Sequence, residues 1–107
     1  MDKSQLLREL TTLPEKMEKA NLKYLSVLSD YEAVQFKITS VKNHAIHLGK
    51  VQGSNEQIRN AALWVEHTKD LEYEKMMLKS ECDILKVHVD FLKMRLESIQ
   101  LMVRLLD

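Results

Sequence analysis

The middle of the chain has cationic side chains and no carboxylates. From Ala33 through Asn55 the sequence has no Asp or Glu, while this stretch and the turn after it contain Lys37, Lys42, Lys50 and Arg59, with His44 and His47. Cations that gather on one surface neutralise backbone phosphates and give salt-dependent binding without base specificity. We therefore predict that Lys37, Lys42, Lys50 and Arg59 bind nucleic acid. The alternative is a solvated helix face whose lysines serve solubility.

Two aromatic residues near these cations could stack on bases. They are Phe36 and Trp64, and stacking requires that they are exposed. For Trp64 the favoured interpretation is packing under the bend of the chain, with base stacking as the alternative.

Other reactive side chains favour structural roles. His44 and His47 lie three residues apart, but a metal site needs further ligands and the surrounding segment offers no carboxylate, so we expect surface histidines and no metal or other cofactor. Cys82, the single cysteine, falls in an apolar series where a small buried thiol is common. Because the sequence has no phosphate-binding glycine loop and no nucleophile elbow, we expect no enzymatic activity and no small-molecule substrate.

Two apolar series predict the elements that position these side chains. In both series the steps alternate between four and three residues, which is typical of a long helix with a narrow seam against another helix. The first series is Leu13, Met17, Ala20, Tyr24, Val27, Tyr31, Val34, Ile38, Val41, Ala45 and Leu48. The second is Leu78, Cys82, Leu85, Val89, Leu92, Leu96, Ile99, Val103 and Leu106. The sequence predicts an all-α fold, an antiparallel and coiled-coil-like helical hairpin.

Capping patterns and helix breakers predict the boundaries. Thr12 and Glu15 have the spacing of a capping box, with Pro14 tolerated in the first turn, and Gly49 suits a C-terminal cap. Thr68 or Asp70 can begin the last helix. We predict a single domain, 1–107, with a short helix over 4–11 that folds back over the bundle end, a long helix over 13–48, an elbow with a short middle helix over 49–67, and a long helix over 70–106.

The last predicted helix has more apolar surface than one seam requires. Met77, Ile84, Phe91 and Leu105 form one additional row, and Val87, Met94 and Leu101 form another. Because ordering the backbone costs about 1–2 kcal/mol per residue and a lone hairpin buries one stripe per helix, the unused rows favour self-association. We expect a homo-oligomer with Ile84, Val87, Phe91, Met94, Leu101 and Leu105 in its interface. The alternative is that the short middle helix and Leu6, Leu7 and Leu10 cover these rows within one chain.

The overall composition gives no long-range attraction to polyanions. Sixteen basic and sixteen acidic side chains cancel. No stretch approaches the roughly 18–20 apolar residues that span a bilayer, and the polar start is unlike a secretory signal. We expect no membrane association and a cytoplasmic location.

The segment from Gly53 to Leu63, followed by Asp70-Leu71-Glu72-Tyr73 and a long amphipathic helix, resembles small helical proteins of tailed bacteriophages. In these proteins a G-x-N-x-x-x-R-x-A elbow follows one long helix and a D-x-E-Y turn opens the next. The matching elbow positions here are Gly53, Asn55, Arg59 and Ala61. Many such proteins have no assigned function, and they are found among replication and recombination genes. The plan also resembles recombination mediators of the UvsY type, which help load a recombinase onto single-stranded DNA.

This resemblance implies a non-enzymatic phage accessory protein that binds single-stranded DNA, or a DNA-bound replication or recombination protein, in the host cytoplasm. The alternative is a protein-only adaptor or inhibitor, such as a host-defence antagonist or a virion component, that acts through an exposed helix groove. An enzyme is the least favoured class, because two rods offer no enclosed pocket.

Overall fold

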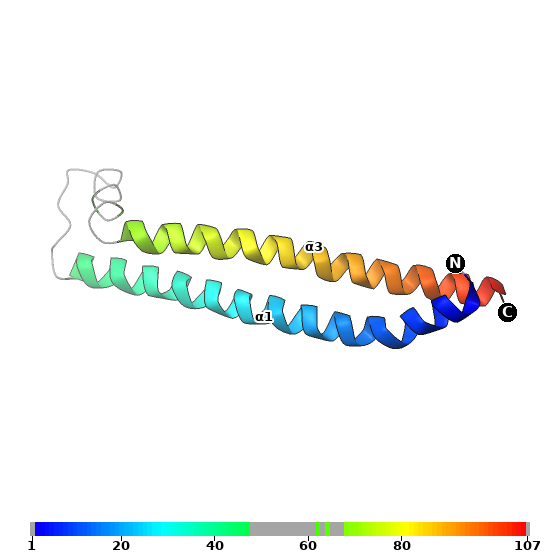
Figure 1. Ribbon diagram of the computed structural model, residues 1–107. Coiled ribbons are helices and arrows are strands. Elements are labelled where there is room, and N and C mark those ends of the chain that lie inside the picture. The colour runs from blue at the N-terminus through cyan, green and yellow to red at the C-terminus, as the bar shows by residue number, and fades with distance from the viewer. Residues whose placement is uncertain (1, 48–61, 63, 65–67, 107) are drawn as a thin grey trace. The chain divides into compact units, whose positions relative to one another are not determined.

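The computed structural model describes residues 2–47, 62, 64 and 68–106. Two long helices, α1 (Lys3–His47) and α3 (Lys69–Leu106), pack against each other as a helical hairpin (Figure 1). The predicted all-α hairpin of two long helices is therefore confirmed. The predicted middle helix, the cap at Gly49 and the elbow motif of Gly53, Asn55, Arg59 and Ala61 lie outside the described residues.

The sequence predicts one domain, whereas the contacts of the chain divide it into two compact units. Unit 1 combines Met1–Val27 with Glu81–Asp107, and unit 2 is Leu28–Ser80. In unit 1, Leu6, Leu13, Leu92 and Ile99 form the buried cluster. In unit 2, the buried residues of α1 are Val34, Ile38 and Ala45. Long paired helices divide in this way because each turn contacts only the turns beside it.

Both predicted seams are confirmed over the described residues. In α1 every described member, from Leu13 to Ala45, is buried or half-buried. In α3 the members from Leu78 to Val103 are buried or half-buried as well, and Ile99 has no exposed surface. The exception is Leu106, which is 54% exposed because it is the last residue of α3 and no further turn covers it.

The predicted short helix over 4–11 and the helix start at 13 are wrong. α1 begins at Lys3 and continues through Pro14, and it bends in its blue N-terminal part (Figure 1). Proline within a helix removes one backbone hydrogen bond and favours a bend. The helix continues because Leu6 and Leu10 extend the four–three series of Leu13 toward the N-terminus, and Leu6 packs in the buried cluster.

The capping box lies ten residues before the predicted one. The Asp2 carboxylate accepts a hydrogen bond from the Gln5 amide at 2.8 Å, and the Gln5 side chain accepts one from the Asp2 amide at 3.2 Å. This reciprocal pair satisfies donors at the helix start. The Thr12 hydroxyl donates instead to the Glu9 carbonyl at 3.3 Å. Thr12 is therefore an interior helical residue rather than a cap.

The predicted start of the last helix is confirmed to within one residue. α3 begins at Lys69, with Asp70 and Glu72 in its first turn. Carboxylates are favourable there because the helix N-terminus has a partial positive charge. Thr68, directly before α3, is completely buried.

Candidate functional site

The side of α3 that faces away from α1 has a second apolar series. In unit 1, the steps alternate between three and four residues, as they do along the buried seam. We call this series the outer ladder, and its members are Ile84, Val87, Phe91, Met94, Ser98, Leu101 and Leu105. At about 100° per residue, its centre lies roughly 150° around the helix from the buried seam.

The apolar members of the outer ladder are exposed. Their exposed fractions run from 57% at Leu101 to 79% at Leu105. Leu6, one of the residues that could cover this face within the chain, is 1% exposed and packs with Leu13 and Ile99 in the buried cluster, and Leu10 packs against that cluster. Leu6 and Leu10 therefore do not cover these rows, while the short middle helix, the other part of that alternative, lies outside the described residues.

The two edges of the outer ladder differ in charge. In heptad notation with Ile84 at position a, the g positions on one edge are Asp83, Asp90, Glu97 and Arg104. The e positions on the other edge are His88, Arg95 and Met102. Asp90 lies 3.6 Å from Lys86 in an exposed pair, and Arg95 donates to Glu9 at 2.9 Å in a pair that is about one-third exposed. One edge is thus mainly acidic, whereas the other has no carboxylate and has one arginine, Arg95.

A groove in unit 1 lies between His88, on this carboxylate-free edge, and three lysines of α1. It has a volume of about 500 Å³ and is lined by Lys16, Lys19, Ala20, Lys23, Leu85, His88 and Leu92. Leu92 is buried and Ala20 and Leu85 are half-buried, so they form an apolar floor. No carboxylate is among these lining residues. Lys19 lies 3.4 Å from the exposed Glu15, outside the groove.

Sequence reasoning missed this lysine row. The signal was present, because Lys16, Lys19 and Lys23 have the i, i+3, i+7 spacing of one helix face beside the seam residue Ala20. It was obscured because Glu15 and Glu18 flank Lys16 in the sequence, so the segment is mixed in charge.

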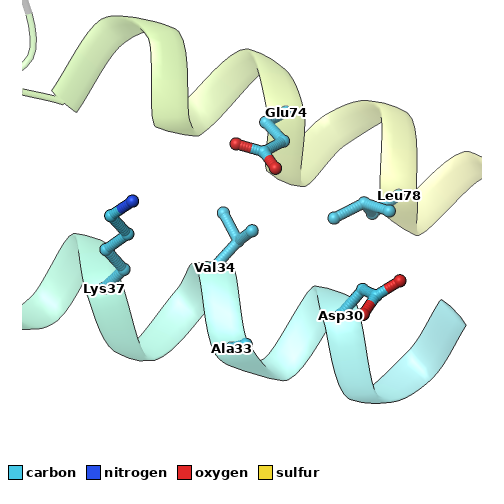
Figure 2. Close-up of a pocket in the computed structure, with 6 residues that line it drawn as sticks. All are labelled: Asp30, Ala33, Val34, Lys37, Glu74 and Leu78. Carbon is cyan, nitrogen blue, oxygen red and sulfur yellow. The ribbon is translucent and has the colours of Figure 1, made fainter. Parts of the chain in front are cut away.

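The predicted cations of the elbow do not form a purely positive surface. Lys42 lies 3.7 Å from Glu72, a residue of α3. Lys37 lines a pocket of about 340 Å³ in unit 2 together with two carboxylates, Asp30 and Glu74. Figure 2 shows the Lys37 amine and the Glu74 carboxylate pointing into the space between α1 and α3. Lys50 and Arg59 lie outside the described residues.

Trp64 is partly exposed and has defined neighbours. Its ring meets Tyr73 edge-on, with centroids 6.4 Å apart and an interplanar angle of 66°. The Lys69 ammonium lies 5.7 Å from the Trp64 centroid, within the range of a cation–π contact. Trp64 retains 41% of its surface exposed and Phe36 retains 75%. Both aromatic residues can therefore be reached from solvent.

The remaining reactive side chains have simple surroundings. Cys82 is buried with 4% of its surface exposed, which confirms the structural interpretation of this thiol. His44 and His47 are exposed near the end of α1. Across residues 2–47, 62, 64 and 68–106, no three His, Cys, Asp or Glu side chains are placed to hold a metal ion.

Within the same ranges, neither α1 nor α3 contains an apolar stretch sufficient to cross a bilayer. No protein family, curated protein or solved structure matches the chain. The resemblance to phage helical proteins therefore stays a prediction from the elbow residues.

Proposed function

We propose that this protein is a non-enzymatic helical scaffold that assembles with a second copy of itself through the outer ladder of α3. The observation that supports this most directly is the exposure of six large apolar side chains at coiled-coil spacing: Ile84, Val87, Phe91, Met94, Leu101 and Leu105. Scattered exposed apolar residues are normal, but an apolar stripe that only Ser98 interrupts is typical of an interaction surface.

The expected gain from covering the stripe is comparable to the cost of association or larger. Burying a large apolar side chain contributes about 1.5–3 kcal/mol when burial is complete, so side chains that are more than half exposed have about 1–2 kcal/mol each to gain. Six such residues on each of two copies give roughly 12–24 kcal/mol. Association costs about 4–15 kcal/mol in lost freedom of motion. The two ranges overlap only between about 12 and 15 kcal/mol, and this balance supports the proposed dimer.

A matched pair of phenylalanine substitutions tests the proposal. Phe91 lies on the outer ladder and is 61% exposed, whereas Phe36 lies on α1 and is 75% exposed. We expect Phe91→Asp to lower self-association more than about 100-fold in sedimentation velocity, because an unpaired charge is costly to bury. Phe36→Asp should leave it unchanged, and both variants should keep their helical circular dichroism. Equal sedimentation of the two variants would reject the outer ladder as the interface.

The second candidate function is binding of single-stranded DNA as a phage accessory protein of replication or recombination. The observation that favours it is the exposed Trp64 ring beside Lys69 and Tyr73, because an aromatic ring next to a cation suits base stacking. The pairing of Lys42 with Glu72 counts against it, since a paired lysine neutralises phosphate less well.

Trp64 is the only tryptophan, so its fluorescence reports directly on this candidate. A labelled oligonucleotide should quench it and shift in a gel at low salt, with both effects fading as salt rises. Charge reversal at Lys42 and Lys50 should weaken the shift. Unchanged fluorescence and no shift at low ionic strength would exclude DNA binding and leave the protein-only adaptor or inhibitor, whose partner would be a polypeptide.

A further inference from the structure

We propose that the two copies pair with their α3 helices parallel and in register, so that the acidic edge of each outer ladder faces the edge of the other that has Arg95 and no carboxylate. This inference rests on the proposed self-association. It adds the orientation in which the second copy lies on the outer ladder. It is carried by the unequal charges of the two edges and by the lysine row that the fold places beside one of them.

Heptad geometry fixes which edges meet in a parallel pair. Each g position lies against the e position five residues later on the partner. Asp83 then faces His88 of the second copy, and Asp90 faces Arg95 of the second copy. By symmetry each contact occurs twice. Charged groups at these positions determine the relative orientation of the two helices more than they increase the affinity of the dimer.

The antiparallel arrangement brings two carboxylates together. With Phe91 packed against Met94 of the second copy, g positions face g positions and e positions face e positions. Asp90 then meets Glu97, and His88 meets Arg95. Asp83 against Arg104 is the single attractive contact in that arrangement. The parallel arrangement therefore has the better charge pattern at the centre of the ladder.

The groove of unit 1 strengthens the same preference. Lys16 and Lys23 are seven residues apart on α1, and Asp83 and Asp90 are seven residues apart on α3, which is about 10 Å in both cases. Both lysines line one groove with His88. A parallel partner helix over the outer ladder would bring its acidic edge to this side of α3. Its carboxylates would then lie toward the lysines as well as toward His88 and Arg95.

The exposed ion pair of Asp90 with Lys86 does not oppose this arrangement. Lys86 and Asp90 are each more than half exposed in their pair, and exposed pairs contribute only about 0–1 kcal/mol. A carboxylate also has several lone pairs, so Asp90 can accept from a partner while Lys86 stays near.

Cysteine cross-linking distinguishes the orientations. The full chain is used with Cys82→Ala as background, since Cys82 is buried on the inner seam and is the only other thiol. Leu101→Cys places a thiol at a d position of the ladder, where the two copies of a parallel pair approach each other at the same residue. We expect Leu101→Cys to form a disulfide-linked dimer in most chains under mild oxidation. Ile84→Cys alone should do the same.

Two different failures are separable by measuring the mass of the reduced variants. In the first case, the reduced Leu101→Cys and Ile84→Cys variants are dimers, and neither cross-links alone, but an equal mixture of the two does. The pair is then antiparallel, and this inference is overturned. If the reduced variants and the Cys82→Ala background are all monomers at high concentration, the proposed self-association itself has failed. Cross-linking that persists in Phe91→Asp chains would also contradict the inference, since it would not depend on the ladder.

Discussion

α3 has two apolar faces with the same spacing, and they differ in what covers them. The inner seam, with Cys82, Leu92 and Ile99, is buried against α1. The outer ladder keeps more than half of every large apolar side chain exposed. Periodicity therefore identifies a helix face that can pack, while the partner determines which face becomes the core. α3 is then the element shared between the fold of one chain and the proposed assembly.

The largest expected difference in stability is between an isoleucine-to-alanine substitution on the inner seam and the same substitution on the outer ladder. Ile99 has no exposed surface and Ile84 is 68% exposed. We expect Ile99→Ala to lower the free energy of unfolding by about 2–5 kcal/mol, because it removes buried methyl groups and leaves a cavity. Ile84→Ala should lower it by less than about 1 kcal/mol in dilute solution, where the chain is monomeric. Urea denaturation at low protein concentration measures both.

This comparison fails if the two alanine variants lose equal stability in dilute solution. That result would mean that the outer ladder is covered within one chain. Repeating the measurement at high concentration sharpens the test, because Ile84→Ala should become more destabilising there as dimers contribute to stability.

A smaller effect is expected from reversing one charge on the acidic edge. Asp90→Lys replaces two attractive contacts of the symmetric dimer with repulsive ones, and we expect dimer affinity to fall about 5–30-fold at low salt, corresponding to about 1–2 kcal/mol. The difference should shrink at high salt. Glu18→Lys, an equal charge change on α1 outside the groove, is the control for net charge. Equal loss in both variants would show that Asp90 has no specific position in the interface.

The smallest effect concerns the ion pair that joins the helices of unit 1. Glu9 and Arg95 lie 2.9 Å apart and are about one-third exposed, whereas Glu15 and Lys19 are about three-quarters exposed. We expect Glu9→Gln to cost about 0.5–1 kcal/mol in urea denaturation and Glu15→Gln to cost less than 0.5 kcal/mol. A larger loss for Glu15→Gln would contradict the view that partial burial strengthens the inter-helix pair.

The helix faces could be predicted from the sequence because they depend on local spacing. Every described member of the two seams is buried or half-buried except the terminal Leu106. The exposed rows of α3 were predictable for the same reason. One boundary was not, because Pro14 and Thr12 have the pattern of a helix start while the phase of Leu6 and Leu10 continues the helix through them.

Charge was harder to predict, since it depends on which segments the fold brings together. The carboxylate-free stretch around Lys37 and Lys42 receives Glu72 and Glu74 from α3, so its charge is partly balanced. Around Lys16 and Lys23 the sequence is mixed in charge, yet the groove that they line contains no carboxylate. A run of charge along the chain is therefore a poor guide to the charge of a surface shared by two helices.

Hydroxyl-radical footprinting across a range of protein concentrations tests the central claim most directly, because it measures the exposure of ladder residues in the unaltered chain. At low concentration Phe91, Met94 and Phe36 should all be oxidised readily, in keeping with exposed fractions of 61%, 66% and 75%. As concentration rises, oxidation of Phe91 and Met94 should fall several-fold while that of Phe36 stays constant. Oxidation of Phe91 and Met94 that stays as high as that of Phe36 at every concentration would contradict assembly through the outer ladder.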